Sequence, residues 1–222
     1  MSILKFFRKT RDLGITGHFT KWYDKNTREN RLSEMIEYAE IVKKHINEGA
    51  HVLEVAPGPG YLSISLAKLG NYHITGMDIS HDFVKICKDN AKRESVNVNF
   101  IQGNVTAMYF DSDSFDFIVC SAAFKNFKEP EKALNEICRV LKKGGIALII
   151  DMRKDVKKEE LKAEAVRVSN SGFERLFMIN TFKMLCNSAY TTDQMKELVS
   201  KTEFSSYNLD LSSIGFNLYL YK

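Results

Sequence analysis

No apolar run in the sequence approaches the ~20 residues that a membrane-spanning helix requires, so we expect no membrane span. The apolar part of residues 1–9 is also too short for a secretory signal, which makes the cytoplasm the expected location. At 222 residues and 44% hydrophobic content, the chain has the size and composition of one soluble domain with a sizeable core.

Cysteine is scarce and scattered. The four cysteines, Cys87, Cys120, Cys138 and Cys186, lie far apart and form no Cys-x-x-Cys pair. Their spacing and apolar neighbours predict buried thiols rather than disulfides or metal ligands. We therefore expect no metal site.

Long runs of one charge are missing as well. The 32 Lys and Arg are interspersed with 28 Asp and Glu, which leaves a formal net charge of only +4. No basic stripe carries interleaved aromatic residues, so nucleic acid is not expected as a partner. A small-molecule substrate is the simpler expectation, and nothing in the sequence specifies an oligomeric state.

What the sequence does contain is a loop rich in glycine and proline between a strand and a helix. The apolar run at 52–55 leads into Ala56-Pro57-Gly58-Pro59-Gly60, and apolar residues at helical spacing begin at Tyr61. A buried parallel strand, a tight loop and a helix packed on the sheet give this pattern. Gly58 and Gly60 lack a Cβ, so the backbone there can touch a ligand. The helix start presents unpaired N–H groups beside them.

A second apolar strand, His73 to Met77, ends at Asp78, eighteen residues after Gly60. An acidic side chain at this place can accept hydrogen bonds from both hydroxyls of a ribose. The two strands with their loops therefore predict a nucleoside pocket at the carboxyl ends of neighbouring strands.

The loop discriminates between nucleosides. A dinucleotide loop reads Gly-x-Gly-x-x-Gly, whereas the frame that begins at Gly58 ends at Ser63. Glu54 near the loop would repel a pyrophosphate, and it suits a ligand that carries an ammonium and a sulfonium. An NAD(P)-dependent oxidoreductase remains an alternative that Ser63 and Glu54 disfavour. A non-catalytic module that binds the same nucleoside is a second alternative.

The stretch Glu54-Val55-Ala56-Pro57-Gly58-Pro59-Gly60 resembles the first motif of class I S-adenosylmethionine-dependent methyltransferases. It is similar in style to the small-molecule enzymes of the family, such as those of quinone biosynthesis. Ala56 stands where the family usually has its first Gly. The resemblance covers residues 30–150 closely. It implies methyl transfer from S-adenosyl-L-methionine to an unidentified small molecule, with S-adenosyl-L-homocysteine as the product.

The resemblance also implies which residues hold this cofactor. They are Glu54, Ala56, Pro57, Gly58 and Gly60 around the loop, Asp78 and Ile79 after the second strand, Asn104 and Val105 after the third, Ser121 after the fourth, and Tyr23 of a Tyr-Asp pair. Asn104 replaces the acidic residue that meets the adenine amino group in the family. Its amide oxygen is expected to accept a hydrogen bond from that group.

No catalytic base is assigned. The family often carries His in the slots filled here by Lys125 and Asn126. Lys125, His18 and Tyr23 are the candidates near the expected pocket mouth. Because the sulfonium is already activated, the protein's task is mainly alignment and desolvation. A base is needed only when the acceptor must lose a proton.

An N-terminal arm precedes the expected core. Residues 2–9 are consistent with a short amphipathic helix, and 11–26 form an irregular stretch with Gly14, Phe19, Trp22 and Tyr23. The aromatic residues either pin the arm to the core or form a lid that closes over the site.

Five strand signals alternate with helical patterns and a hairpin ends the sequence, which predicts a three-layer α/β fold with a mainly parallel sheet. The resemblance adds a Rossmann-like seven-stranded sheet of order 3-2-1-4-5-7-6 with strand 7 antiparallel. We expect a single methyltransferase domain over 1–222. Its parts are the arm (1–26), the cofactor-binding core (27–150), a helical insertion that covers substrate (151–190), and a terminal helix and hairpin (191–222). Within them, helices are expected over Thr27–Ile46, Tyr61–Leu69, Phe83–Ala91, Glu131–Leu141 and Thr192–Lys201, and strands over 52–55, 73–77, 96–101, 115–120, 146–150, 205–211 and 215–221.

Overall fold

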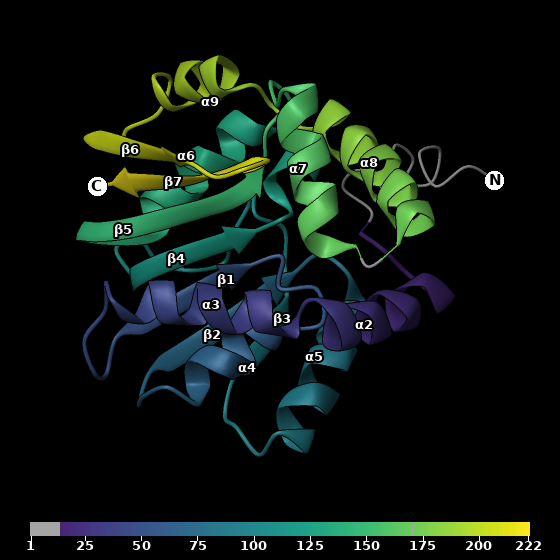
Figure 1. The fold of residues 1–222 in the computed structure, drawn as a ribbon. Coiled ribbons are helices and arrows are strands. Elements are labelled where there is room, and N and C mark those ends of the chain that lie inside the picture. Colours follow the sequence, from purple (N-terminus) through teal and green to yellow (C-terminus); the bar gives the residue numbers. More distant parts are fainter. Residues whose placement is uncertain (1–13, 170) are drawn as a thin grey trace.

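A computed structural model describes residues 14–169 and 171–222, which form a seven-stranded sheet covered by helices on both faces (Figure 1). The strands are β1 (His51–Val55), β2 (His73–Asp78), β3 (Asn99–Gln102), β4 (Phe115–Ser121), β5 (Leu141–Met152), β6 (Ser206–Leu211) and β7 (Gly215–Tyr221). Their order in the sheet is β3-β2-β1-β4-β5-β7-β6. The first five are parallel, and β7 is antiparallel to both β5 and β6. The predicted fold class and strand order are confirmed.

The helices explain why the central strands read as continuous apolar runs. They are α2 (His18–Asn30), α3 (Leu32–Lys43), α4 (Tyr61–Ala67), α5 (His81–Arg93), the short 3₁₀ helix η1 (Phe124–Asn126), α6 (Pro130–Val140), α7 (Lys158–Val168), α8 (Gly172–Asn187) and α9 (Thr192–Val199). Val52 of β1 packs in a cluster with α3 and α4, whereas Leu53 packs in a second cluster with α6 and α9. Because both faces of the sheet are covered, both sets of strand side chains are buried.

The first helical region differs from the prediction. Residues 18–26, expected to be irregular, belong to α2, and the single helix expected over Thr27–Ile46 is two helices that meet at Arg31. Arg31 leaves helical geometry, with φ −131° and ψ 8°. Only Thr20 and Thr27 of α2 are buried, so this helix lacks an apolar stripe. The sequence pattern therefore did not predict it. The proposed helix over 2–9 lies outside the described residues.

Three further details correct the expectations. Not every apolar residue of the helix expected over Thr27–Ile46 faces the core: Leu32 and Ile36 are 36% and 46% exposed, while Met35, Ala39 and Val42 are buried. The third strand starts at Asn99 rather than Val96. The fifth strand starts at Leu141 rather than at residue 146, and the Lys-Lys-Gly-Gly segment at 142–145 is an irregularity within it, since Leu141 and Ile146 both pair with β4.

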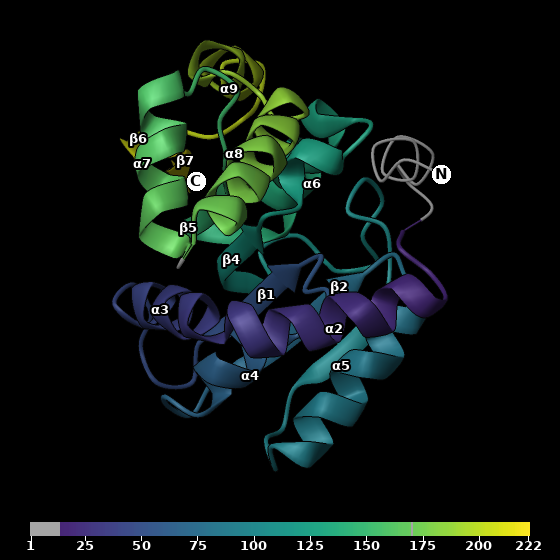
Figure 2. The same ribbon diagram turned by 45° about the vertical axis from the view of Figure 1, so that its right-hand side comes forward.

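The C-terminal third follows the prediction closely. The segment 151–190 is helical, as α7 and α8, and the Thr191 hydroxyl accepts a hydrogen bond from the N–H of Gln194 at the start of α9. The hairpin of β6 and β7 completes the sheet edge. Helices α7 and α8 lie side by side (Figure 2). They share a small apolar cluster, built around Leu161, Phe182 and Cys186, that also includes Ile214 before β7 and touches Met152 of β5.

The cysteine prediction is confirmed for bonding and burial. All four cysteines are free and buried. Burial, with the charge of Asp151 adding to it, raises the pKa of the Cys120 thiol, so this side chain remains a neutral core residue.

Candidate functional site

The carboxyl ends of β1, β2 and β4 open into a pocket on the surface of the molecule. Its walls come from the loops after these strands and from α2 and α3, which cross in front of them (Figure 2). The strand order reverses between β1 and β4, and ligands of open α/β sheets bind at such a point. A pocket therefore lies at the edge of the sheet where the sequence predicts a nucleoside site.

Gly58 and Gly60 play different parts in the loop. Both have positive φ, +56° and +83°. A Cβ on Gly58 would meet only the Tyr23 ring, at 3.6 Å, so this glycine exposes bare backbone to the pocket. A Cβ on Gly60 would lie 2.9 Å from Phe100 and 3.0 Å from the Cys87 sulfur. The Cβ position of Gly60 therefore faces the core, and Gly60 is not among the residues that line the pocket, so its contact with a ligand remains a prediction.

Two alanines flank the opening between β1 and β4. Ala56 follows β1 with φ +56°, and Ala122 follows β4 with φ +55°. The Ala56 N–H donates to the Met77 carbonyl at 2.8 Å, and the Ala122 N–H donates to the Ile150 carbonyl at 2.7 Å. The turn after β1 is therefore hydrogen-bonded to β2, and the turn after β4 is hydrogen-bonded to β5. The gap between these two turns remains for a ligand. The left-handed conformation at Ala56 accounts for the glycine that the family usually has there.

Asp78 ends β2 on the pocket wall and is 6% exposed. Its Oδ2 accepts from the Gly58 N–H at 3.1 Å and its Oδ1 from the Ser80 N–H at 2.8 Å. Burial raises the pKa of Asp78 to about 6, although these two hydrogen bonds oppose the shift. Each oxygen keeps acceptor capacity for a ligand hydroxyl. Ile79 lies beside it in the pocket wall.

Glu54 lies beneath the loop rather than in the pocket wall. It is 2% exposed, and its Oε2 accepts from both the N–H and the hydroxyl of Ser63. Burial raises the pKa of Glu54 to about 7, with the Ser63 hydrogen bonds opposing and the charge of Asp78 adding to the shift. Ser63, the residue that departs from the dinucleotide pattern, is thus the partner of the buried acid.

Asn104 lines the pocket, but its amide oxygen is already engaged. This oxygen accepts from the N–H and the hydroxyl of Thr106, both at 3.0 Å, which uses its two lone pairs. The expected acceptance from an adenine amino group is therefore unsupported. The Nδ2 group is the part of Asn104 that is left to donate to a ligand. Gly103, Val105 and Thr106 line the same wall.

Helices α2 and α3 supply a wall that the sequence prediction mostly missed. Arg31 is the one Lys or Arg among the pocket-lining residues of the described chain. Its guanidinium donates to Glu34 at 2.7 Å and to the Tyr23 hydroxyl at 3.3 Å. Burial acts to lower the pKa of Arg31, but Tyr23 and Glu34 outweigh it and raise that pKa, so the group is cationic. The Thr27 hydroxyl is buried in this wall without a hydrogen-bond partner among the described residues.

A methyltransferase domain model matches residues 46–203 of the chain. The chain belongs to this methyltransferase family. The region of the match contains the glycine loop, Asp78, Asn104 and the carboxyl ends of all the central strands. The oxidoreductase alternative has no support from any comparison.

Individual relatives of this methyltransferase resemble it over part of their length. It is 36% identical over 107 residues to the ribosomal protein L11 methyltransferase of Dictyoglomus thermophilum, covering 48% of this chain and 34% of that protein. It is 35% identical over 100 residues to the demethylmenaquinone methyltransferase of Chlorobaculum tepidum, covering 45% and 40%. The match therefore spans between a third and two fifths of these relatives.

The solved structure of the plantazolicin methyltransferase BpumL, in complex with a desmethylPZN analog and SAH, shares the fold. The TM-score is 0.72 at 14% identity, over 99% of this chain and 98% of that one.

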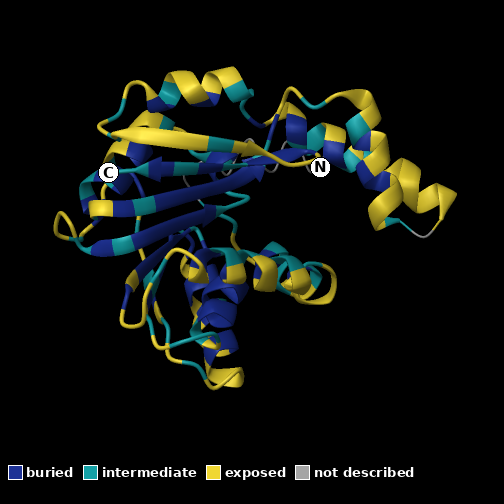
Figure 3. Ribbon diagram, turned by 60° about the vertical axis from the view of Figure 1, so that its left-hand side comes forward, coloured by how far each residue is buried: buried dark blue, intermediate teal, exposed yellow. Residues whose placement is uncertain are grey.

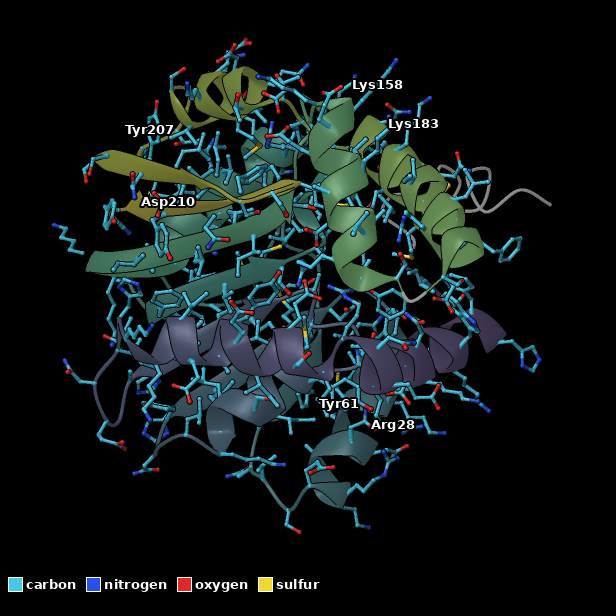
Figure 4. The ribbon with its side chains drawn as sticks, in the orientation of Figure 1. Arg28, Tyr61, Lys158, Lys183, Tyr207 and Asp210 are labelled. Atoms are coloured by element: carbon cyan, nitrogen blue, oxygen red, sulfur yellow. The ribbon has the colours of Figure 1, made fainter. Side chains whose placement is uncertain are left out.

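The candidate bases of the methyltransferase are dispersed. Lys125 is buried, and its Nζ donates to Asp151 at 2.8 Å and to the Ala122 carbonyl at 2.7 Å, so it secures the turn after β4 (Figure 4 shows the side chains). His18 is exposed and does not line the pocket. Tyr23 is the only one of the three among the described lining residues. The structure thus adds no reason to assign a base.

Several other predicted residues of the methyltransferase can now be placed. Ala56, Pro57 and Ser121 line the pocket as expected, with Ala122, Asn126 and Phe127 as unpredicted neighbours. Trp22 is 55% exposed and stacks on Phe19, with ring centroids 5.0 Å apart, so it does not cover the site. Closure of the arm remains a prediction, and residues 11–13 of it lie outside the described part.

Within 14–169 and 171–222, no three His, Cys, Asp or Glu side chains gather as a metal site would require. None of the helices in that part of the chain is long and apolar enough to cross a membrane. The residues that line the pocket come from 14–127, so a substrate cover formed by 151–190 also stays a prediction.

Proposed function

We propose that the chain binds S-adenosylmethionine in this pocket and transfers its methyl group to a small molecule. The observation that carries the proposal is the buried carboxylate of Asp78, held at the pocket wall by the N–H of Gly58, the glycine whose missing Cβ leaves bare backbone facing the same space. The family match supports this use of the two residues.

The adenosine end of the cofactor fits the side of the pocket formed by β2 and β3. Asp78 has acceptor capacity for the ribose hydroxyls, as described above. Ile79 and Val105 can provide apolar contact for the adenine ring, and the Nδ2 group of Asn104 can donate to a ring nitrogen.

The methionine end fits the side formed by α2 and α3. Its carboxylate needs a cation, and Arg31 is the guanidinium available in the described pocket wall. Arginine favours such planar, charge-assisted pairing. Tyr23, already bonded to Arg31, holds the guanidinium in place from the α2 side. The positive ammonium and sulfonium lie toward the loop, where Glu54 and Asp78 supply negative charge when ionised.

When bound, the cofactor supplies an activated methyl group, whose bond to sulfur breaks as the bond to the acceptor atom forms. The chain's own residues align the two molecules and exclude water. Met35, Ala123, Asn126 and Phe127 line the part of the pocket that remains for the acceptor. These residues offer an apolar surface with one amide, which suits a small and largely uncharged molecule.

Calorimetry with S-adenosylhomocysteine tests the cofactor assignment. Asp78→Ala should weaken binding by ~2 kcal/mol or more, about 30-fold, because charge-assisted hydrogen bonds to ribose are lost. Asp89→Ala, an exposed carboxylate on α5, is the matched control and should bind normally. An unchanged dissociation constant in folded Asp78→Ala would reject the assignment. Since the pKa of Asp78 is about 6, affinity should also decline as the pH falls below 6.

Transfer itself requires a second measurement. Incubation of the protein and radiolabelled S-adenosylmethionine with a small-molecule extract should label a metabolite, and Arg31→Met should abolish that label at low cofactor concentration. Binding without transfer to any fraction would favour the non-catalytic alternative, which the lack of an assignable base leaves open.

A further inference from the structure

Helix α2 is hydrogen-bonded to the helices around the glycine loop through Asp24, the second residue of the Tyr-Asp pair. The Asp24 Oδ1 accepts from the Tyr61 hydroxyl at 2.8 Å and from the Asn90 Nδ2 group at 2.9 Å. Tyr61 begins α4, directly after the loop, and Asn90 lies on α5. Both donors belong to buried residues, which Figure 3 colours dark blue. One carboxylate oxygen therefore joins α2, α4 and α5.

Asn90 extends this connection to the loop itself. Its Nδ2 group also donates to the Pro59 carbonyl at 2.9 Å, while its Oδ1 accepts from the Arg93 guanidinium at 3.0 Å. Three residues earlier on α5, the Cys87 thiol donates to the Gly58 carbonyl at 2.9 Å. Both of these loop carbonyls are thus bonded to α5, and Asn90 is a common partner of the loop and of α2.

Tyr23, the first residue of the pair, meets the same loop from the pocket. A Cβ on Gly58 would lie 3.6 Å from the Tyr23 ring, which also packs edge-on against Phe83 of α5 with ring centroids 5.7 Å apart. The Tyr23 hydroxyl accepts from Arg31, the guanidinium of the pocket wall. Adjacent residues of a helix point about 100° apart, so Tyr23 can face the pocket while Asp24 is bonded to α4 and α5. The place of Tyr23 and Arg31 in the wall therefore depends on where Asp24 fixes α2.

The hydrogen bonds of Asp24 matter here more than its charge. Its ionic partner is Arg28, whose guanidinium lies 3.7 Å from the other oxygen, Oδ2, and whose side chain is 44% exposed. Figure 4 shows Arg28 and Tyr61 next to each other below α2. Exposed pairs of this kind contribute little to stability. Burial and the hydrogen bond to Asp24 raise the pKa of Tyr61 to about 12, so the Tyr61 hydroxyl stays protonated and remains a donor.

We propose that Asp24 is a positioning residue for the methyl transfer. It holds α2 against the glycine loop, so that the methionine end of the cofactor meets Tyr23 and Arg31 in a fixed geometry. This role rests on the cofactor binding proposed above. Alignment of the methyl group with its acceptor is the main task of the protein, and a wall carried on a separate helix aligns a ligand only while that helix is docked.

The effect on affinity follows from the population of docked molecules. Only molecules in which α2 is docked bind the methionine end with full affinity, so the apparent dissociation constant rises as that population falls. Removal of the Asp24 carboxylate leaves two buried donors, on Tyr61 and Asn90, without their acceptor, which disfavours the docked state. Asp78 lies on the sheet and does not depend on this contact.

Calorimetry with S-adenosylhomocysteine tests the proposal on the full chain. Asp24→Leu, which is similar in shape but has no acceptor, should weaken binding by about tenfold or more. Asp24→Asn keeps an oxygen at Oδ1 and should stay within about threefold of the parent. Glu29→Leu removes an exposed carboxylate from the same helix and is the matched control, which should bind normally. Circular dichroism verifies that each variant is folded.

Two further variants separate positioning from a general loss of stability. Asp24→Leu combined with Arg31→Met should bind at most about threefold more weakly than Arg31→Met alone, because Asp24 acts through the wall that Arg31 completes. Tyr61→Phe retains the buried ring and removes one of the two donors, so it should weaken binding several-fold. It takes the place of Asp24→Leu in the test if that variant does not fold.

Three outcomes in a parent protein that binds S-adenosylhomocysteine would overturn the positioning role. They are normal affinity of folded Asp24→Leu, or of Tyr61→Phe in its place; an equal loss in Asp24→Asn, which would assign the effect to charge; and full additivity of Asp24→Leu with Arg31→Met. Failure of the parent to bind S-adenosylhomocysteine would instead reject the cofactor assignment, so the two failures are distinguishable.

Discussion

Replacing Glu54 by Gln is the substitution whose outcome the structure specifies best. Glu54 is buried under the glycine loop, and Ser63 donates two hydrogen bonds to one of its oxygens. The amide oxygen of Gln can accept the same two bonds, so the change removes a titratable group with little change in shape. The variant therefore isolates the effect of a buried charge on stability.

The sign follows from the direction of the shift. Burial raises the pKa of Glu54 from 4.5 to about 7 in the folded protein. Between these values the folded state holds a proton that the unfolded state has lost, so the free energy of unfolding decreases as the pH rises. At ~1.36 kcal/mol per pKa unit, the full penalty is about 3 kcal/mol. It is absent below pH 4.5 and complete above pH 7.

Urea unfolding at pH 4.5, 6 and 8 measures this effect. The variant and the parent should be similarly stable at pH 4.5, and at pH 8 Glu54→Gln should be more stable by up to about 3 kcal/mol. Glu29→Gln removes an exposed carboxyl and should stay within ~0.5 kcal/mol of the parent at every pH. A stability difference between Glu54→Gln and the parent that is independent of pH, or that shrinks as the pH rises, would refute the reasoning.

Three other predictions concern the loop and the arm. Ala56→Gly should raise the free energy of unfolding by ~0.5–1 kcal/mol in urea titrations, because relief of the left-handed strain exceeds the added entropy of the unfolded chain; a loss of stability would contradict the strain. Gly60→Val should destabilise the fold by ~2 kcal/mol or more through overpacking against the core, whereas Gly58→Ala should mainly weaken S-adenosylhomocysteine binding in calorimetry; the reverse pattern would exchange their roles. The emission of Trp22, the only tryptophan, should shift or be quenched on addition of S-adenosylhomocysteine if the arm closes, and constant emission at saturation would exclude closure.

The sheet was predictable because its signals are local. Each central strand is a short apolar run, and Asp78 and the glycine loop mark two of their carboxyl ends. Parallel strands bring those ends to one edge, so the pocket follows from order in the sequence alone. The side chains of Ser80 and Thr191 cap α5 and α9, and such a cap is likewise a local feature that depends on a few adjacent residues.

The wall formed by α2 and α3 was not predictable in that way. Arg31 lies at a break between two helices, and no Gly or Pro marks this break in the sequence. The orientation of its guanidinium depends on Tyr23 and Glu34, which come from the turns on either side. The packing of Gly60 against the core was not predictable either, because the sequence shows that a Cβ is missing but not which neighbour requires this. Phe100, forty residues away, supplies the reason. Both failures concern contacts between elements rather than the elements themselves.

The separate cluster beneath α7 and α8 gives that hairpin a degree of independence. Its core residues Leu161 and Phe182 belong to none of the clusters that hold the sheet, and they meet the sheet edge at Ile214 and Met152. Amide protons of the hairpin can therefore exchange with solvent through local opening, while those of β1 and β4 exchange only when the whole domain unfolds. The same partition has an evolutionary meaning. Mutations can lengthen, replace or reorient the hairpin with little loss of stability in the sheet. The surface formed by the hairpin can therefore diversify while the pocket at the strand ends stays constant.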